Sequence, residues 1–278
     1  MSKSISKSSI SHIIAYVVVF AGGLWTLVPL YWMVVTAFKT RLEIWSYPPY
    51  FWPPSFTMEG FIEAWTHGGA IGFQHSAVVA VGTLVLSLLV GLPAAYSIAR
   101  FKTGGDDLSF TVLSFRFMPP IAPAVGFWVF ANKIQLFDTF WILILVNSMA
   151  SIPFVVWIMK GFIEEIPYAI EEAAQVDGAP WLKIIRDHVL PLAAPGLVAV
   201  ALFVLVFTWN EFLFATILTG RFIQPFPKAV PGMTYGVHEP NWGAVSAMGM
   251  MVVVPIVLLS FYMQKYIVRG MTYGAIRE

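Results

Sequence analysis

The sequence of 278 residues contains no cysteine. Disulfides, thiol catalysis and cysteine-ligated metal sites are therefore excluded. Charged residues are also scarce, at 11% of the chain, whereas they make up about a quarter of a typical soluble domain. The formal net charge is only +1, and no cluster of Lys and Arg is present that could neutralise phosphates. A nucleic-acid partner is therefore not expected.

Several motifs of catalytic sites are missing as well. No Gly-x-x-x-x-Gly-Lys-Ser/Thr loop occurs, so the chain is not expected to hydrolyse ATP itself. No Gly-x-Ser-x-Gly nucleophile motif is present, and the five histidines lack the paired spacing of metal ligands. We therefore expect a chain that is not an enzyme, with no catalytic residues, no metal and no cofactor of its own.

Apolar side chains, in contrast, make up 58% of the residues and give a mean hydropathy of +0.77. The charges are clustered and leave long apolar stretches between them, so the expected solvent is lipid. A membrane helix needs roughly 20 mostly apolar residues. The predicted fold is all-α and integral to the membrane, with six transmembrane helices at about 13–37, 76–99, 109–131, 139–160, 193–218 and 243–264.

The distribution of Lys and Arg orients these helices, because positive residues are retained in the cytoplasm. The side that carries both termini has ten of them: Lys3, Lys7, Arg100, Lys102, Lys160, Lys183, Arg186, Lys265, Arg269 and Arg277. The other side has five: Lys39, Arg41, Lys133, Arg221 and Lys228. Both termini are therefore predicted to be cytoplasmic. The outer segment 44–56 is rich in aromatic residues and proline, which is typical of a membrane interface; a contact with a receptor is the alternative.

A polar segment of about residues 164–191 separates the fourth and fifth predicted spans. Pro167 can occupy the first turn of a helix, and Gly178 can end that helix in a left-handed conformation. A second short helix can begin at Pro180 and end before Pro191. The sequence therefore predicts a cytoplasmic loop of two short helices.

This loop resembles the signature of the permease subunits of bacterial ABC importers. The signature runs Glu-Ala-Ala, three residues, Gly, nine residues, and Ile-x-Leu-Pro. The sequence matches it at Glu172, Ala173, Ala174, Gly178, Leu190 and Pro191. His188 occupies the position of the family's Ile, whose apolar packing is expected to come from the neighbouring Val189.

The resemblance implies a role for the loop in coupling. In the family, its first helix sits in a cleft of a separate ATPase subunit, where small residues allow close approach and polar partners hold the carboxylate. The residues expected to couple this chain to an ATPase are Glu171, Glu172, Ala173, Ala174, Asp177, Gly178 and Ala179. ATP and Mg²⁺ are expected in that partner ATPase. In the alternative interpretation, Glu171 and Glu172 are merely solvated and favour the helix N-terminus.

The resemblance also implies the assembly. Residues 1–278 would form a single transmembrane domain in the bacterial inner membrane, paired with a second, homologous permease of different sequence. Two ATPase subunits and an extracytoplasmic solute-binding protein complete the expected set of partners, besides the lipid bilayer. Closure of the ATPase pair would rotate the spans and produce alternating access.

Weaker motifs narrow the resemblance to the carbohydrate group that includes maltose-type permeases. The tail at Thr272, Tyr273 and Gly274 is similar to a segment that reaches the ATPase subunits in that group. The other motifs are Phe38-Lys39-Thr40, His75-Ser76 in place of Asn-Ser, Pro93-Ala94-Ala95-Tyr96, Ala99-Arg100-Phe101 and Trp209-Asn210-Glu211-Phe212, the last of which resembles a polar break in the fifth span. The implied cargo is a sugar or a sugar derivative, with polyols and glycerol phosphates as competitors.

Two charged residues, Arg116 and Glu211, fall within predicted spans, where charge normally faces a bundle interior or a water-filled cavity. Pro119 and Pro120 follow Arg116 and would loosen that helix. A sugar site combines aromatic faces with amide and carboxyl groups. The predicted substrate pathway is Arg116, Trp209, Asn210 and Glu211. The alternative is that Arg116 snorkels, or pairs with Glu211 and locks two spans together.

Two other classes of membrane protein remain open at this point. A secondary transporter driven by an ion gradient would use Arg116 and Glu211 as relays, and six spans could form half of a repeat-built fold. It would not explain the cytoplasmic loop. A purely structural membrane scaffold would predict no stimulation of an ATPase by a solute receptor.

Overall fold

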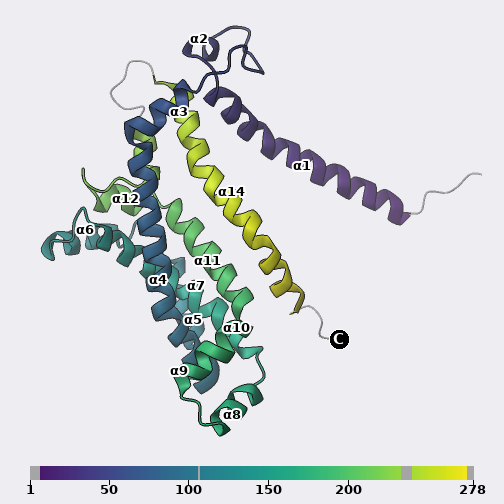
Figure 1. Cartoon of the computed structure of the whole chain (residues 1–278), viewed down its shortest axis with the longest axis vertical. Coiled ribbons are helices and arrows are strands. Elements are labelled where there is room, and N and C mark those ends of the chain that lie inside the picture. The colour runs from purple at the N-terminus through teal and green to yellow at the C-terminus, as the bar shows by residue number, and fades with distance from the viewer. Residues whose placement is uncertain (1–6, 106, 233–239, 274–278) are drawn as a thin grey trace, which may run out of the picture. The chain divides into compact units, whose positions relative to one another are not determined.

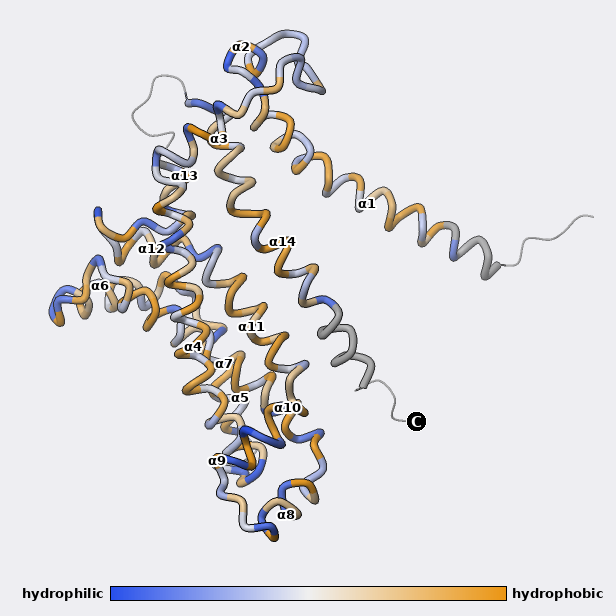
Figure 2. The backbone as a smooth tube through the Cα atoms, viewed as in Figure 1, coloured by the Kyte–Doolittle hydropathy of each residue, from blue (hydrophilic) through white to orange (hydrophobic). Residues whose placement is uncertain are grey.

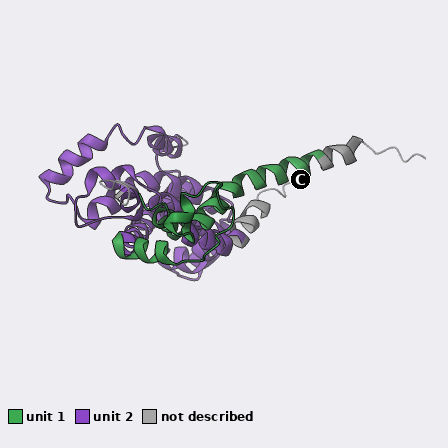
Figure 3. Ribbon diagram, turned by 90° about the horizontal axis from the view of Figure 1, so that it is seen from above, with its two compact units in different colours: residues 1–67, 232–251 green, residues 68–231, 252–278 purple. Residues whose placement is uncertain are grey.

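The computed structural model describes residues 7–105, 107–232 and 240–273 (Figure 1). Throughout these ranges all regular secondary structure is helical. The chain divides into two compact units, which Figure 3 colours separately. The first comprises residues 1–67 and 232–251, and the second comprises residues 68–231 and 252–278.

The first unit contains α1 (Lys7–Ala37), α2 (Arg41–Ile44), α3 (Glu59–Ala64) and the first turns of α14 (Trp242–Tyr273). The loop between α1 and α3 is held by Lys39, which is buried and whose Nζ donates to Tyr50 O at 2.5 Å. Thr40 and Glu43 form a capping box at the start of α2. The aromatic outer segment is thus a structured loop.

The second unit holds the remaining helices. A π-helical turn, η1 (Trp65–Gly69), leads from α3 into this unit. Its elements are α4 (Ala70–Phe101), α5 (Leu108–Ser114), the 3-10 turn η2 (Phe115–Phe117), α6 (Ala124–Lys133), α7 (Phe140–Glu164), α8 (Ala169–Val176), α9 (Trp181–Ile184), the π-helical turn η3 (Ile185–Val189), α10 (Leu190–Leu192), α11 (Ala194–Trp209), α12 (Leu213–Leu218) and α13 (Phe226–Gly232), followed by the rest of α14.

Three helices, α4, α7 and α11, pack together and form the centre of this unit. They are apolar along most of their length, while hydrophilic residues gather around α8 and α9 (Figure 2). Gly82 and Gly91 of α4 face α7, where an added Cβ would lie 2.5 Å from Ile144 Cδ1 and 2.6 Å from Val155 Cγ1. Small residues thus let the two helices approach closely.

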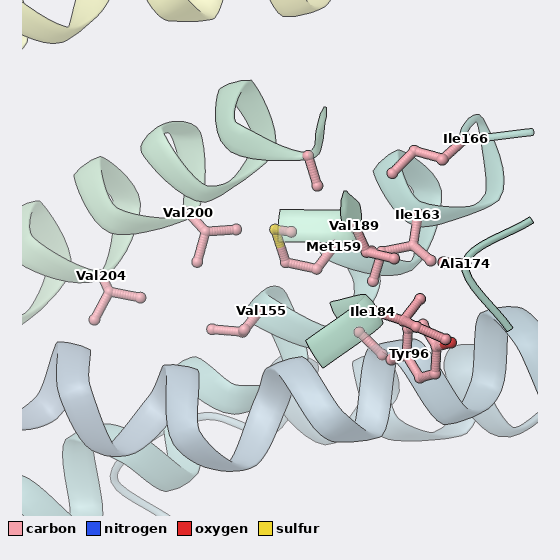
Figure 4. Packing of buried hydrophobic residues seen from close by; sticks show 12 residues of the cluster. Tyr96, Val155, Met159, Ile163, Ile166, Ala174, Ile184, Val189, Val200 and Val204 are labelled. Atoms are coloured by element: carbon pink, nitrogen blue, oxygen red, sulfur yellow. The ribbon is translucent and has the colours of Figure 1, made fainter. Parts of the chain in front are cut away.

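One buried apolar cluster joins these helices to the predicted cytoplasmic loop. Figure 4 shows side chains of α4, α7 and α11 converging with side chains of the loop. Its buried members are Ala95, Tyr96, Val155, Met159, Ile163, Ile166, Ala174, Ile184, Val189, Ala193, Val200 and Val204. The loop is therefore packed against the ends of the long helices.

Four predicted spans are confirmed as continuous apolar helices. Ile14–Ala37, Glu59–Phe101, Phe140–Glu164 and Trp242–Gln264 are long and apolar enough to cross a membrane. The second of these is longer than predicted, since it begins at α3 and runs through η1 into α4. Counting a bent helix pair as a fifth crossing, the described chain has four or five candidate spans.

The prediction of one continuous helix at 109–131 is wrong. The structure has α5, η2 and α6 there, and residues 118–123 between them are not helical. Pro119, Pro120 and Pro123 explain the interruption, because proline lacks the N–H that a helix interior needs. The prediction that the prolines loosen this segment is confirmed.

The predicted span at 193–218 is also divided. Its helix α11 ends at Trp209, and α12 begins at Leu213 after the polar pair Asn210 and Glu211. The break lies at the motif for which the resemblance implied one. At its other end, α11 makes an angle of 81° with the helical segment Trp181–Leu192.

Candidate coupling loop and cavity

The predicted cytoplasmic loop forms two helical segments joined by a tight turn. α8 ends at Val176, and Gly178 adopts φ +79°, a left-handed conformation that glycine accommodates without strain. The second segment starts at Trp181 with Pro180 at its N-cap. The prediction that it ends before Pro191 is wrong: α9, η3 and α10 follow one another without a break, and Pro191 lies inside α10.

α8 has an inner and an outer face. Glu171 and Ala174 are buried, and Ile170 packs on the same apolar cluster. Glu172 and Ala173 are exposed. The spacing of the inner residues is that of one helical face, so the other face of α8 is open to a partner.

A groove of about 650 Å³ is lined by α8, the turn that follows it, and residues of the second helical segment. Five of the seven residues predicted to contact an ATPase line it, namely Ala173, Ala174, Asp177, Gly178 and Ala179. The lining residues are Ala169, Ile170, Ala173, Ala174, Asp177, Gly178, Ala179, Pro180, Lys183 and His188. Most are small, which leaves room for close approach by another chain.

Glu171 is not on this groove. Its side chain is fully buried, and its Oε1 accepts a hydrogen bond from Arg100 Nε at 2.6 Å. Its Oε2 accepts one from the Tyr96 hydroxyl at 2.5 Å. The alternative that Glu171 is a solvated charge at a helix N-terminus is wrong; the exposed Glu172 remains compatible with it.

The sequence singled out Tyr96 and Arg100 only as parts of short motifs, and their role as partners of Glu171 was missed. They lie four residues apart on α4, so both side chains project from one face. A tyrosine and an arginine with this spacing near the end of an apolar helix indicate that the helix binds a carboxylate there. Which carboxylate they hold, 71 residues later, is not visible in the sequence.

Val189 supplies the buried apolar side chain expected near the family's Ile position. It is 1% exposed and belongs to the same cluster as Ile184, whereas His188 lines the groove beside α8. In η3 the N–H of Leu190 bonds to Ile185 O, five residues back rather than four. The extra residue in this turn shifts the side chains that follow it around the helix axis. Val189, and not His188, therefore lies on the same buried face as Ile184.

The polar residues predicted for a substrate pathway line one cavity. Its volume is about 950 Å³, and it lies among η2, the segment 118–123, α6, α7, α11 and α12. Arg116, Asn210 and Glu211 all contribute to its wall. Most of the other lining residues are apolar, and the further polar ones are Asn147, Ser151 and Thr208.

Arg116 does not form an ion pair with Glu211 in the described structure. Its Nη1 donates to Ala150 O at 3.1 Å, and its guanidinium lies 5.1 Å and 4.7 Å from the ring centroids of Phe154 and Phe207. Glu211 instead accepts the N–H groups of Phe214 and Ala215, at 2.7 and 3.0 Å. These contacts satisfy the free donors at the start of α12, and the alternative of an Arg116–Glu211 lock is wrong.

Trp209 does not line this cavity. It is 8% exposed, its Nε1 donates to Val252 O at 3.2 Å, and its ring contacts Phe73 and Phe226. The predicted group of three is thus divided between a packed tryptophan and two residues at the cavity. Of the predicted tail residues, Thr272 and Tyr273 form the last turn of α14, and Gly274 lies outside the described residues.

A second set of polar side chains fixes the segment that follows α12. Asp138 accepts the N–H groups of Phe222 and Ile223, each at 3.0 Å. Partial burial raises the pKa of Asp138, but hydrogen bonds from backbone N–H groups outweigh it and hold the pKa below its usual range. His75 and Ser76 accept the N–H groups of Gln224 and Phe226, both at 2.9 Å. The His-Ser motif therefore anchors a distant loop, which its sequence does not indicate.

Comparison with known proteins identifies the family of this chain. The family of binding-protein-dependent transport system inner membrane components matches residues 87–273. A probable ABC transporter permease of Sinorhizobium fredii is 36% identical over 258 residues, which are 90% of each chain. A melibiose, raffinose and stachyose import permease of Bacillus subtilis is 29% identical and covers 90% of this chain and 91% of its own.

A solved structure supports the fold. A bacterial ABC transporter involved in the import of the acidic polysaccharide alginate contains a chain that superimposes with a TM-score of 0.82 at 20% identity. The alignment covers 95% of this chain and 99% of the other. The relatives are non-catalytic permease subunits, and the resemblance stated from the motifs is confirmed. The comparisons do not support a transporter driven by an ion gradient. The chain belongs to the inner membrane components of binding-protein-dependent transport systems, the multi-pass permease subunits of ABC transporters.

Proposed function

We propose that this chain is one transmembrane subunit of an ATP-driven, binding-protein-dependent importer of a sugar or sugar derivative. The observation that carries the proposal is the position of the family signature on an exposed helix, α8, beside a groove of small residues. Relatives that transport melibiose, trehalose and maltose support the carbohydrate class. The cognate binding protein selects the cargo, so the solute it retains identifies the substrate.

The proposed assembly contains a second, different permease, two ATPase subunits that hold ATP and Mg²⁺, and an extracytoplasmic binding protein. The chain crosses the inner membrane six times as a single transmembrane domain with both termini in the cytoplasm. The divided segments 109–131 and 193–218 then count as crossings, since broken helices are tolerated where they line a cavity. The tail at Thr272 and Tyr273 contacts the ATPase pair.

Coupling in this proposal is mechanical. One ATPase subunit accommodates the outer face of α8, with Ala173 and Gly178 allowing close approach and Glu172 bonded to polar groups of the partner. ATP binding closes the ATPase pair, and α8 follows its cleft. The spans then shift between inward-open and outward-open states, which is a bistable rigid-body transition biased by nucleotide.

A matched pair of variants on α8 tests the docking. Ala173→Leu places a larger side chain in the groove, whereas Gln175→Leu adds a similar side chain at an exposed position of the same helix outside it. We expect Ala173→Leu to reduce co-purification of the ATPase and ATP-dependent uptake in proteoliposomes, and Gln175→Leu to retain both. Equal retention of the ATPase by the two variants would exclude the groove as the docking site.

The cavity is the proposed substrate pathway. Its volume of about 950 Å³ is at the upper end of the range of roughly 300–1,000 Å³ that is usual for small-molecule sites. Arg116 and Asn210 offer donors for hydroxyl groups, and the aromatic residues of the wall offer faces for a pyranose ring. The mixture of apolar wall and few polar groups suits a sugar better than an ion.

Transport at limiting substrate tests this pathway. We expect Asn210→Ala to raise the substrate concentration for half-maximal uptake and leave ATPase docking intact. Thr216→Ala is the matched control, because Thr216 is an exposed residue of α12 that does not line the cavity. Unchanged uptake by Asn210→Ala at limiting substrate would remove Asn210 from the pathway while leaving the importer assignment in place.

A further inference from the structure

The buried carboxylate of Glu171 has an unusual position for a residue of a docking helix. It lies on α8 next to the exposed Glu172, yet its side chain is 0% exposed. Burying a carboxylate is unfavourable unless it is paired and hydrogen-bonded. Both oxygens of Glu171 have such partners, and both partners belong to α4.

Arg100 connects α4 to more than one point of the loop. Its Nε donates to Glu171, and its Nη2 donates to Ile166 O at 3.0 Å, in the turn before α8. Its guanidinium also lies 5.7 Å from the ring centroid of Tyr168. The side chain is only 8% exposed. One arginine thus fixes the entry to α8 and the helix itself.

Side-chain contacts join α8 to α4. The elements that α8 packs on most are α9 and η3, and α4 is reached through the side chains of Glu171, Arg100 and Tyr96. These three residues make the polar part of the link, beside the apolar cluster to which both helices contribute. A buried ion pair adds little net stability compared with apolar packing, but it permits one arrangement only, because any slip leaves a charge unpaired.

We infer that Glu171, Arg100 and Tyr96 form a rigid tie that makes α8 and α4 move as one body during the transport cycle. Glu171 is in this assignment a positioning residue and not a contact of the ATPase. The inference rests on the proposed function, since it assumes that α8 receives the motion of an ATPase. The inference adds that α4 carries the motion received by α8 into the membrane.

Two measurements on the assembled transporter distinguish a role of these three residues in transmitting motion from a role in stability alone. The first is the amount of solute transported per ATP hydrolysed in proteoliposomes that contain the partner permease, the ATPase and the binding protein. We expect Glu171→Gln to keep the ATPase bound but to lower this ratio by about tenfold, within the usual range of coupling between sites. Gln175→Ala, an exposed change on α8, is the control and keeps the wild-type ratio.

The second measurement is the distance between α8 and α4. The chain has no cysteine, so cysteines introduced at Val176 and Leu89 can carry spin labels in a transporter whose partner chains lack cysteine. These positions are 89% and 68% exposed and lie on α8 and α4. The distance distribution is expected to stay the same with and without ATP in the otherwise native chain, and to broaden with Glu171→Gln.

A double variant covers the case that Glu171→Gln does not fold. Combining it with Arg100→Gln removes both charges and leaves neither unpaired, so the chain is expected to assemble and to be uncoupled. If neither variant assembles, the label distance in the otherwise native chain decides.

A label distance that changes with ATP in that chain would overturn the tie, and so would variants that transport as much per ATP as the native chain. Loss of ATPase binding in Glu171→Gln would also overturn it, because it would make Glu171 a docking residue. Failure of the proposed function has a different signature: no ATPase would bind to the native chain.

Discussion

The turn η3 predicts which of two neighbouring residues stabilises the loop. Val189 is 1% exposed and packs with Ile184 and Ala174, whereas His188 faces the groove. The family pattern places its apolar residue at position 188. We therefore predict that Val189→Ala destabilises the chain and that His188→Ile, which restores the family residue, does not stabilise it.

The magnitude follows from the buried volume. Val189→Ala removes two methylene-sized groups, each of which contributes about 0.8 kcal/mol when buried. A partly unfilled cavity raises the cost to about 2 kcal/mol. For a chain of this length that corresponds to a melting temperature lower by about 4 °C. His188→Ile changes a position outside the core and is expected to alter stability by less than about 0.5 kcal/mol.

Thermal unfolding of the purified permease, followed by its tryptophan fluorescence, measures both variants. The eleven tryptophans include Trp181 at the start of the same helical segment. The reasoning is refuted if His188→Ile raises the melting temperature while Val189→Ala leaves it unchanged. That result would mean that the turn has regular α-helical register and that position 188 faces the core.

Two further predictions concern packing and charge. Gly91→Ala brings a Cβ to 2.6 Å from Val155 Cγ1 and should lower the free energy of unfolding by about 1–3 kcal/mol. Gly161→Ala is the control and should not lower the melting temperature, because its Cβ meets no atom within 4 Å. Equal melting temperatures of the two variants would contradict the close approach of α4 and α7. Asp138→Asn should lower the melting temperature at neutral pH. The pKa of Asp138 is lower in the folded chain than in the unfolded one. Its contribution to stability is therefore present above the unfolded pKa of about 3.9 and is lost as the pH falls below that value. The difference in melting temperature between wild type and variant should shrink below about pH 4, and a difference that stays constant with pH would contradict this.

The long apolar helices could be predicted because a long apolar run has one stable form in lipid, and the single proline inside each of them does not interrupt it. The segments 109–131 and 193–218 are apolar as well, and composition alone does not tell where the backbone stops being helical. Prolines after Arg116 and the polar pair at 210 and 211 mark the breaks. The number of residues in each piece depends on tertiary packing, which a local pattern does not contain.

The coupling loop was predictable at Gly178, since its left-handed conformation is a local property of glycine. The inner position of Glu171 was not, because its partners lie in another helix and the same residue would suit a solvated helix start. The π-helical turn η3 also leaves no trace in the sequence pattern. It adds one residue to a turn, and this moves the buried position from 188 to 189.

Glu171 and Glu211 show how a buried or membrane-embedded carboxylate can be assigned to the wrong partner from sequence. Both were candidates for contact with another molecule, and both have their oxygens occupied within the chain, Glu171 by α4 and Glu211 by the N-terminus of α12. A carboxylate that already accepts two hydrogen bonds has less to offer a sugar hydroxyl. Arg116 donates one hydrogen bond, to Ala150 O, out of five available. The polar recognition of a solute in this cavity should therefore depend on Arg116 and Asn210 more than on Glu211, whose replacement would act mainly by loosening α12.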